Sequence, residues 1–235
     1  MAANTELVRF ATPFDLLDLF PPEGRVAVIG NAPSVLENNY GAYIDSHDVI
    51  VRFNECAVEG YESKVGSRTD ILITNVYPEK RTRKPGDGRP IKLVLAIASQ
   101  IRRGSMQSFT SWIGDYLTLF TYSPDLIGVP DSAHRAGLTT GTYGIQLIWR
   151  LLRPSKIFLT GFTMFSDSAQ SHYWAEGDMA SRGSHDFEAE PLIFCKLLNS
   201  IRPKLEVTGE ILHVFKKVGM RPSPYISTMC LDENP

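Results

Sequence analysis

Short apolar runs alternate along the chain with segments whose apolar residues recur every three or four positions. Each run is rich in Val, Ile and Leu and ends at polar or glycine residues. Apolar residues at consecutive positions predict strands that are buried on both faces, as in a parallel sheet. The runs are RVAVIG (25–30), HDVIVRFN (47–54), TDILITN (69–75), IKLVLAIAS (91–99), KIFLTGF (156–162) and KLEVTGEI (204–211).

Helical spacing appears between these strands. Residues 139–155 and 184–203 both carry apolar side chains at i, i+3, i+4 and i+7, and both segments approach a proline at their end. A short helix is predicted within residues 12–20, and a third, weaker one over residues 105–120. Strands that alternate with helices predict an α/β fold, a single Rossmann-like domain with a mainly parallel sheet.

Two segments break this alternation. Residues 78–90 combine several Gly and Pro with no apolar periodicity, which predicts a surface loop. Residues 166–186 carry no regular pattern, and a loop of that length inside a compact domain is typically a lid or a binding loop. The length of 235 residues fits one globular domain spanning residues 1–235.

Composition and charge narrow the classes of function. The net charge of −2 provides no general attraction for nucleic acid. Cys56, Cys195 and Cys230 form no C-x-x-C pair, so we expect reduced thiols with no disulfide and no zinc site. No signal peptide or membrane-spanning run is evident, which favours a cytoplasmic protein. The basic run Lys80–Lys84 is interpreted as a solvated loop, with peripheral membrane contact or an anionic acceptor as the alternative.

Polar residues follow several of the predicted strands. In open α/β sheets, ligands bind beyond the carboxyl ends of the strands. These ends are rich in amide, hydroxyl and glycine groups, which suit a base edge or a sugar hydroxyl. The TTG turn (139–141) opens a helix and favours an anion, although Thr139 or Thr140 serving only as a helix cap explains it equally well.

The remaining patterns favour a site without metal. The chain contains no D-x-D pair and no His/Cys cluster, so we expect no metal and no separate cofactor. The first turn, GNAPS (30–34), lacks G-x-G-x-x-G, which disfavours a nicotinamide or flavin oxidoreductase. His172 and His185 both lie at the predicted lid, where one imidazole is suited to act as a base and the other to hold a phosphate.

Four segments, taken in order, resemble the sialylmotifs of the animal-type sialyltransferase family. Residues 26–79 are similar to the long motif, with its YG..ID.HD.I.R.N core and YPE end. Residues 138–162 are similar to the short motif, and HYW (172–174) resembles the third motif. His185 and Glu190 match the very short H-x4-E motif.

The resemblance implies an activity and its partners. The family transfers sialic acid from CMP-sialic acid to a sugar hydroxyl, with inversion and without metal, on a variant of the A-type glycosyltransferase fold. The expected partners are therefore a CMP-sugar donor and an oligosaccharide or glycolipid acceptor, with no nucleic acid. We expect the domain to divide into an N-terminal helix (1–24), a nucleotide-binding core (25–75 and 139–163) and a lid loop (166–186).

Roles carried over from the family fall on matching positions. Two histidines are implied in catalysis: His185 as the general base and His172 at the leaving phosphate. Glu190 is given a supporting role. The residues implied in holding the donor are Asn31, Ser34 and Asn54 for CMP, Tyr77 for the phosphate, Thr139, Thr140 and Gly141 for ribose and phosphate, and Gly161 and Phe162 beside the cytosine.

Departures from the family leave two alternatives open. The short-motif region has no cysteine to form the disulfide of the animal enzymes, which favours a bacterial or soluble member. Ala175 follows HYW where the family has an acidic or polar residue, and GNAP replaces GNSG. The donor is alternatively another CMP-activated 3-deoxy-2-ketoacid, such as CMP-Kdo. The chain is alternatively a CMP-binding protein without transfer activity.

Overall fold

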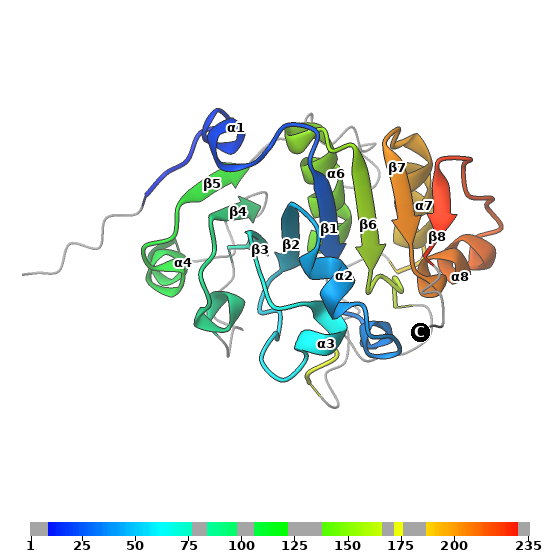
Figure 1. Ribbon diagram of the computed structural model, residues 1–235, viewed down its shortest axis with the longest axis horizontal. Coiled ribbons are helices and arrows are strands. Elements are labelled where there is room, and N and C mark those ends of the chain that lie inside the picture. The colour runs from blue at the N-terminus through cyan, green and yellow to red at the C-terminus, as the bar shows by residue number, and fades with distance from the viewer. Residues whose placement is uncertain are drawn as a thin grey trace, which may run out of the picture.

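A single sheet forms the centre of the molecule (Figure 1). The structure is a computed structural model that describes residues 9–76, 84–97, 106–121, 138–165, 172–175 and 187–229. Its eight strands are all parallel and lie in the order β5-β4-β3-β2-β1-β6-β7-β8. They are β1 (Arg25–Ile29), β2 (Val49–Phe53), β3 (Ile71–Asn75), β4 (Leu93–Ile97), β5 (Thr118–Thr121), β6 (Lys156–Thr160), β7 (Lys204–Val207) and β8 (Ile226–Thr228).

Helices cover both faces of this sheet. The side chains of β1 alternate between the faces, because Val26 and Val28 pack into one apolar cluster while Ala27 and Ile29 pack into another. The first cluster includes α1 (Asp15–Leu19), α6 (Thr140–Leu152), α7 (Glu190–Ser200) and α8 (Gly209–Lys217). The opposite face is covered by the 3-10 turn η1 (Pro33–Leu36), α2 (Gly41–Asp45), α3 (Glu62–Val65) and α4 (Met106–Ile113). A further 3-10 turn, η3, spans Pro85–Gly88.

The predicted α/β fold with its mainly parallel sheet is confirmed, and each of the six predicted strands contains an observed one. The single helix predicted over residues 105–120 is wrong. Its first part is α4, but Gly114 has a φ of +61° and ends the helix, since glycine adopts the left-handed region without steric cost. The chain then continues as β5, with Thr118 and Leu119 buried. Neither β5 nor the three-residue edge strand β8 was predicted.

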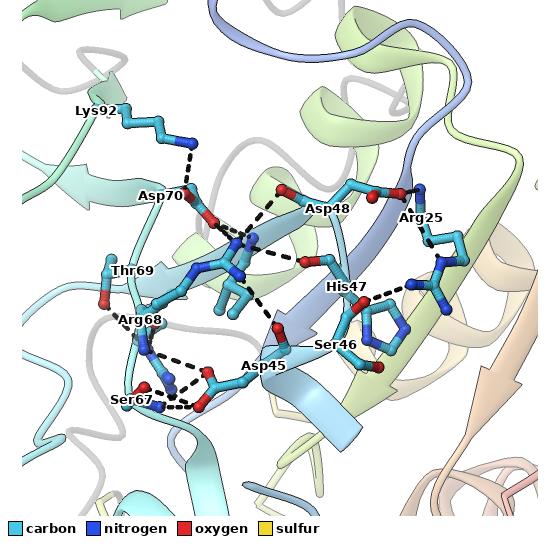
Figure 2. A network of polar contacts seen from close by, with 12 residues as sticks. Arg25, Asp45, Ser46, His47, Asp48, Ser67, Arg68, Thr69, Asp70 and Lys92 are labelled. Carbon is cyan, nitrogen blue, oxygen red and sulfur yellow. Dashed lines mark hydrogen bonds and ion pairs between the residues drawn. The ribbon is translucent and has the colours of Figure 1, made fainter. Parts of the chain in front are cut away.

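Charged residues join the starts of neighbouring strands (Figure 2). Arg25 opens β1, and its backbone N–H donates to the carboxylate of Asp48, which precedes β2, at 2.7 Å. Asp70 precedes β3 and pairs with Arg68 at 2.8 Å and with Lys92 at 2.9 Å. Burial alone would raise the pKa of the Asp70 carboxyl, but the hydrogen bonds from Lys92 and Arg68 outweigh it and hold the pKa below its ordinary value. This network stabilises the amino edge of the sheet.

A buried arginine fixes the connection from α3 to β3. Arg52 of β2 is 1% exposed, and its guanidinium donates to the carbonyl oxygens of Gly66 at 3.1 Å and Arg68 at 3.0 Å. From the other side, the Asp45 carboxylate accepts the backbone N–H and the hydroxyl of Ser67, each at 2.8 Å. The Arg and Asp positions of the long motif thus hold backbone in this structure.

His47, also in the long motif, is enclosed by aromatic and apolar groups. Its ring is 2% exposed and stacks on Phe158 with ring centroids 5.9 Å apart, while Nδ1 donates to the Tyr43 carbonyl at 2.9 Å. Burial lowers the pKa of the imidazole below its ordinary value of 6.5, although the bond to the Tyr43 carbonyl opposes this shift. The neutral ring is therefore the form that the fold stabilises.

Stability should consequently fall as the pH drops below about 6.5, because the unfolded chain binds a proton that the folded His47 resists. The limiting slope for one such group is about 1.4 kcal/mol per pH unit. We expect His47→Phe to flatten the slope between pH 6.5 and 5, as measured by urea unfolding. His213→Phe, at an exposed position on α8, serves as the control and should keep the slope. An unchanged slope in His47→Phe would show that His47 does not cause the loss of stability at low pH.

Candidate functional site

The order of the strands places a topological switch point at the carboxyl edge of the sheet. From β1 the chain adds β2 to β5 on one side, then returns to add β6, β7 and β8 on the other side. The carboxyl ends of β1 and β6 therefore flank the topological switch point, where open α/β sheets bind their ligands. Residues 30–34 leave β1 here and residues 161–162 leave β6, so the switch point brings together two of the predicted binding segments.

Gly30 and Gly161 lie against each other at the switch point. The Gly30 N–H donates to the Thr160 carbonyl at 2.8 Å, and the Ala32 N–H donates to the Gly161 carbonyl at 3.1 Å. A Cβ on Gly30 would lie 2.1 Å from the Gly161 carbonyl oxygen. Gly161 has a φ of +78°, and a Cβ there would lie 2.4 Å from Val35. The glycine of the first turn is thus required for the contact between two strand ends, independently of any ligand.

The two predicted CMP-binding asparagines lie at the ends of adjacent strands. The Asn31 Nδ2 donates to the Phe53 carbonyl at 3.1 Å, which ties the turn after β1 to the end of β2. Asn54 directly follows β2 with a φ of +54°, and its Oδ1 accepts from the Thr74 hydroxyl at 3.4 Å. Both side chains are half-buried, so both can present amide groups to a ligand at the switch point.

The third predicted motif is fastened to the first turn. The Tyr173 N–H donates to the Asn31 carbonyl at 3.0 Å, and the Tyr173 hydroxyl donates to the Ala57 carbonyl. Tyr173 is 6% exposed, so it anchors the segment, and burial raises the pKa of its hydroxyl. The half-buried ring of His172 stacks on Trp174 with centroids 4.7 Å apart. His172 is therefore held next to the asparagine turn.

The TTG turn opens α6 and is engaged in capping. The Thr139 Oγ1 accepts from the Thr142 N–H at 3.3 Å, so the capping role expected as the alternative is realised at this residue. Thr140 and Gly141 occupy the first turn of the helix, where backbone N–H groups have no intrahelical acceptor. The anion-binding capacity of this turn therefore resides in main-chain N–H groups and in the helix dipole.

Phe162 has a packing role. Its ring is 4% exposed and lies between the rings of Phe53 and Phe194, at centroid distances of 5.8 and 5.9 Å. A Cβ on Gly141 would lie 3.0 Å from this ring, so the glycine lets α6 approach the end of β6. The predicted position beside cytosine can accordingly be served by the main chain of residue 162.

Ser34 differs from the other candidates. It lies in η1, and its hydroxyl oxygen is buried without a hydrogen-bond partner among the residues that the structure describes. A buried hydroxyl usually finds a partner, so this group has hydrogen-bonding capacity to offer to a ligand at the first turn.

Glu190 joins two helices. It is the first residue of α7 and is 2% exposed. Its Oε1 accepts from the Thr139 N–H at 2.7 Å and from the Thr142 hydroxyl at 2.8 Å, so it fixes the amino end of α6. The carboxylate thus holds the turn that opens α6, and the supporting role implied for Glu190 remains a prediction.

We expect Glu190→Ala to lower the free energy of unfolding by about 2 kcal/mol, because a buried N–H and a hydroxyl lose their acceptor. The TTG turn should loosen at the same time, so that any phosphate-containing ligand binds more weakly. Chemical denaturation and calorimetry of CMP binding measure the two effects. Glu188→Ala, an exposed neighbour, should change stability by less than about 0.5 kcal/mol. Equal stability of both variants would contradict the role of Glu190 in holding the amino end of α6.

Several predictions fall outside the described residues. These are Tyr77, His185, the basic run except Lys84, and the predicted lid (166–186) except residues 172–175. Within the described ranges, no helix combines the length and apolarity needed to cross a bilayer. The same ranges contain no cluster of three or more His, Cys, Asp or Glu placed to hold a metal ion. The metal-free reaction and the cytoplasmic location remain predictions.

The parallel sheet with helices on both faces is an α/β domain of the Rossmann-like kind. Residues 22–100 match the family described as glycosyltransferase family 29 (sialyltransferase). The chain is 28% identical, over 207 residues, to a human protein named CMP-N-acetylneuraminate-beta-galactosamide-alpha-2,3-sialyltransferase 1; the match covers 76% of this chain and 57% of that protein. The chain is also 27% identical to the Mus musculus protein named CMP-N-acetylneuraminate-beta-galactosamide-alpha-2,3-sialyltransferase 2. That match covers 78% of this chain and 56% of the mouse protein.

A solved structure has a similar fold. A mammalian sialyltransferase crystallised with Gal-beta-1-3GalNAc-ortho-nitrophenol superposes with a TM-score of 0.51 at 24% identity, covering 78% of this chain and 68% of the other. The chain is thus similar to the glycosyltransferase family 29 (sialyltransferase) model over residues 22–100, and to proteins named sialyltransferases over most of its length. It spans little more than half the length of the curated relatives that it matches over most of its own length.

One relative is named for a different sugar. Over 49 residues the chain is 43% identical to beta-1,6-galactosyltransferase GALT29A of Arabidopsis thaliana, which is 21% of this chain and 12% of that protein. Strong similarity over a short segment therefore does not by itself identify the sugar that is transferred.

Proposed function

We propose that the protein is an inverting, metal-independent glycosyltransferase that moves sialic acid from CMP-sialic acid to the hydroxyl of a glycan acceptor. The observation that carries the proposal is the hydrogen bond of 3.0 Å from the Tyr173 N–H to the Asn31 carbonyl. It joins the third motif to the turn of the long motif at the switch point. His172, the residue proposed to contact the phosphate, is thereby held beside Asn31, which is proposed to contact the nucleoside.

The donor is held by groups from four segments. Asn31 and Asn54 present amides from the ends of β1 and β2, suited to the base edge or the ribose hydroxyls. The N–H groups at the start of α6 and the dipole of this 13-residue helix attract the phosphate. The buried hydroxyl of Ser34 is available at the first turn. No carboxylate is required to contact the donor, which suits an anionic ligand.

The reaction follows as a single displacement. The acceptor oxygen attacks the anomeric C2 of sialic acid while the bond from C2 to the phosphate oxygen breaks, so CMP leaves as a phosphate monoester. His185 takes the proton of the acceptor hydroxyl. His172 and the hydroxyl of Tyr77 donate to the phosphate, where charge accumulates in the transition state.

The test is a panel of CMP-activated sugars assayed for CMP release with and without glycan acceptors. Acceptor-dependent release from CMP-sialic acid supports the proposal. Release from CMP-Kdo alone would replace sialic acid by another 3-deoxy-2-ketoacid. Calorimetric binding of CMP with no turnover on any donor would instead identify a CMP-binding protein, and the absence of both would reject the site.

A further inference from the structure

A carboxylate from the far side of β6 reaches the switch point. Glu210 lies in the first turn of α8, directly after the end of β7. Its Oε1 accepts from the Gly161 N–H at 2.7 Å and from the Thr208 hydroxyl at 2.5 Å. The side chain is half-buried, so the bond to the backbone is partly shielded from water. Hydrogen bonds to an ionised acceptor are about twice as strong as those between neutral groups.

The peptide unit between Thr160 and Gly161 is held from both sides. Its carbonyl, on Thr160, accepts from the Gly30 N–H at 2.8 Å, and its N–H, on Gly161, donates to Glu210. The two groups of a planar peptide point in opposite directions, so fixing one side orients the other. Gly161 then turns out of the sheet with a φ of +78°, and its own carbonyl accepts from Ala32 at 3.1 Å.

We propose that Glu210 is a positioning residue for the proposed donor site, acting through the Thr160–Gly161 peptide on the turn after β1. The proposal rests on the proposed function, because it takes that turn and the end of β6 to hold CMP. Glu210 has no role in proton transfer here. Removing it should therefore weaken binding of the donor and leave the chemical step nearly unchanged.

Three variants separate this role from general stability. Glu210→Ala removes the acceptor, Glu210→Gln keeps an amide oxygen at the same reach, and Lys216→Ala is an exposed control on the same helix. We expect Glu210→Ala to raise the KM for the CMP-sugar and the Kd for CMP about tenfold, with kcat changed less than about threefold. Glu210→Gln and Lys216→Ala should stay within about threefold of the unchanged protein in all three quantities.

An unchanged Kd in folded Glu210→Ala would overturn the proposal, as would a Gln variant as weak as the Ala variant. Should Glu210→Ala not fold, Glu210→Asp withdraws the carboxylate by one methylene and gives the same comparison. Amide hydrogen exchange provides a readout independent of ligand: the Gly161 N–H should exchange about tenfold faster without the acceptor. If the unaltered protein fails to bind CMP, the proposed function fails. If exchange of the Gly161 amide is not faster in Glu210→Ala, the hydrogen bond from Gly161 to Glu210 is rejected separately.

Discussion

Gly30→Ala is expected to destabilise the protein by about 3 kcal/mol and to abolish CMP binding. The added methyl would lie 2.1 Å from the Gly161 carbonyl oxygen, which is backbone and cannot rotate away. Either β1 and β6 must separate at their ends, or the turn that carries Asn31 must move. Urea unfolding measures the first effect and calorimetry with CMP the second.

The matched control for this substitution is Gly209→Ala. Gly209 begins α8, and no atom lies within 4 Å of the position that its Cβ would occupy. Its replacement should change stability by less than about 0.5 kcal/mol and leave the affinity for CMP unaltered. Normal stability and affinity in Gly30→Ala would mean that the two strand ends do not approach as closely as the structure shows.

His185→Ala should reduce turnover by about 10²-fold or more while the affinity for CMP is retained. The reason is that a general base acts on the acceptor hydroxyl and makes no contact with the nucleotide. The position lies five residues before Glu190, which is bound to the amino end of α6. Steady-state rates at saturating donor and calorimetry with CMP give the two measurements.

His213→Ala serves as the control for loss of an imidazole, because His213 is exposed on α8. Its turnover should match that of the unaltered protein. Unchanged turnover in His185→Ala would reject the base assignment. A parallel loss of CMP affinity would instead give His185 a role in binding the donor.

Much of the sheet could be predicted because its strands are buried on both faces. The strands β1 to β4 and β6 each contain a run of at least three consecutive apolar residues, and these apolar residues are buried because helices cover both sides of the sheet. The strand β5 has only four residues and follows α4 after a glycine, so the apolar spacing of the helix continued across it. Local spacing does not resolve such a boundary.

The candidate site could be predicted only as separate segments. The ends of β1 and β6 were each recognisable, but their adjacency depends on the strand order, which no local pattern encodes. The contacts that assemble the site join residues far apart in the chain, such as Tyr173 to Asn31 and Glu210 to Gly161. Glu210 carries no motif, and a glutamate near the start of a helix is ordinarily interpreted as a favourable charge at the helix dipole.

The polar network at the amino edge of the sheet bears on how proteins that carry such a motif are compared. Asp45, Arg52 and Asp70 lie within the long motif, yet each holds backbone or another charge on the scaffold. A descendant that lost its chemistry, or exchanged its donor, would still need these residues in order to fold. Retention of the long motif is therefore a record of shared architecture. Activity must be judged from the few positions that line the opposite edge.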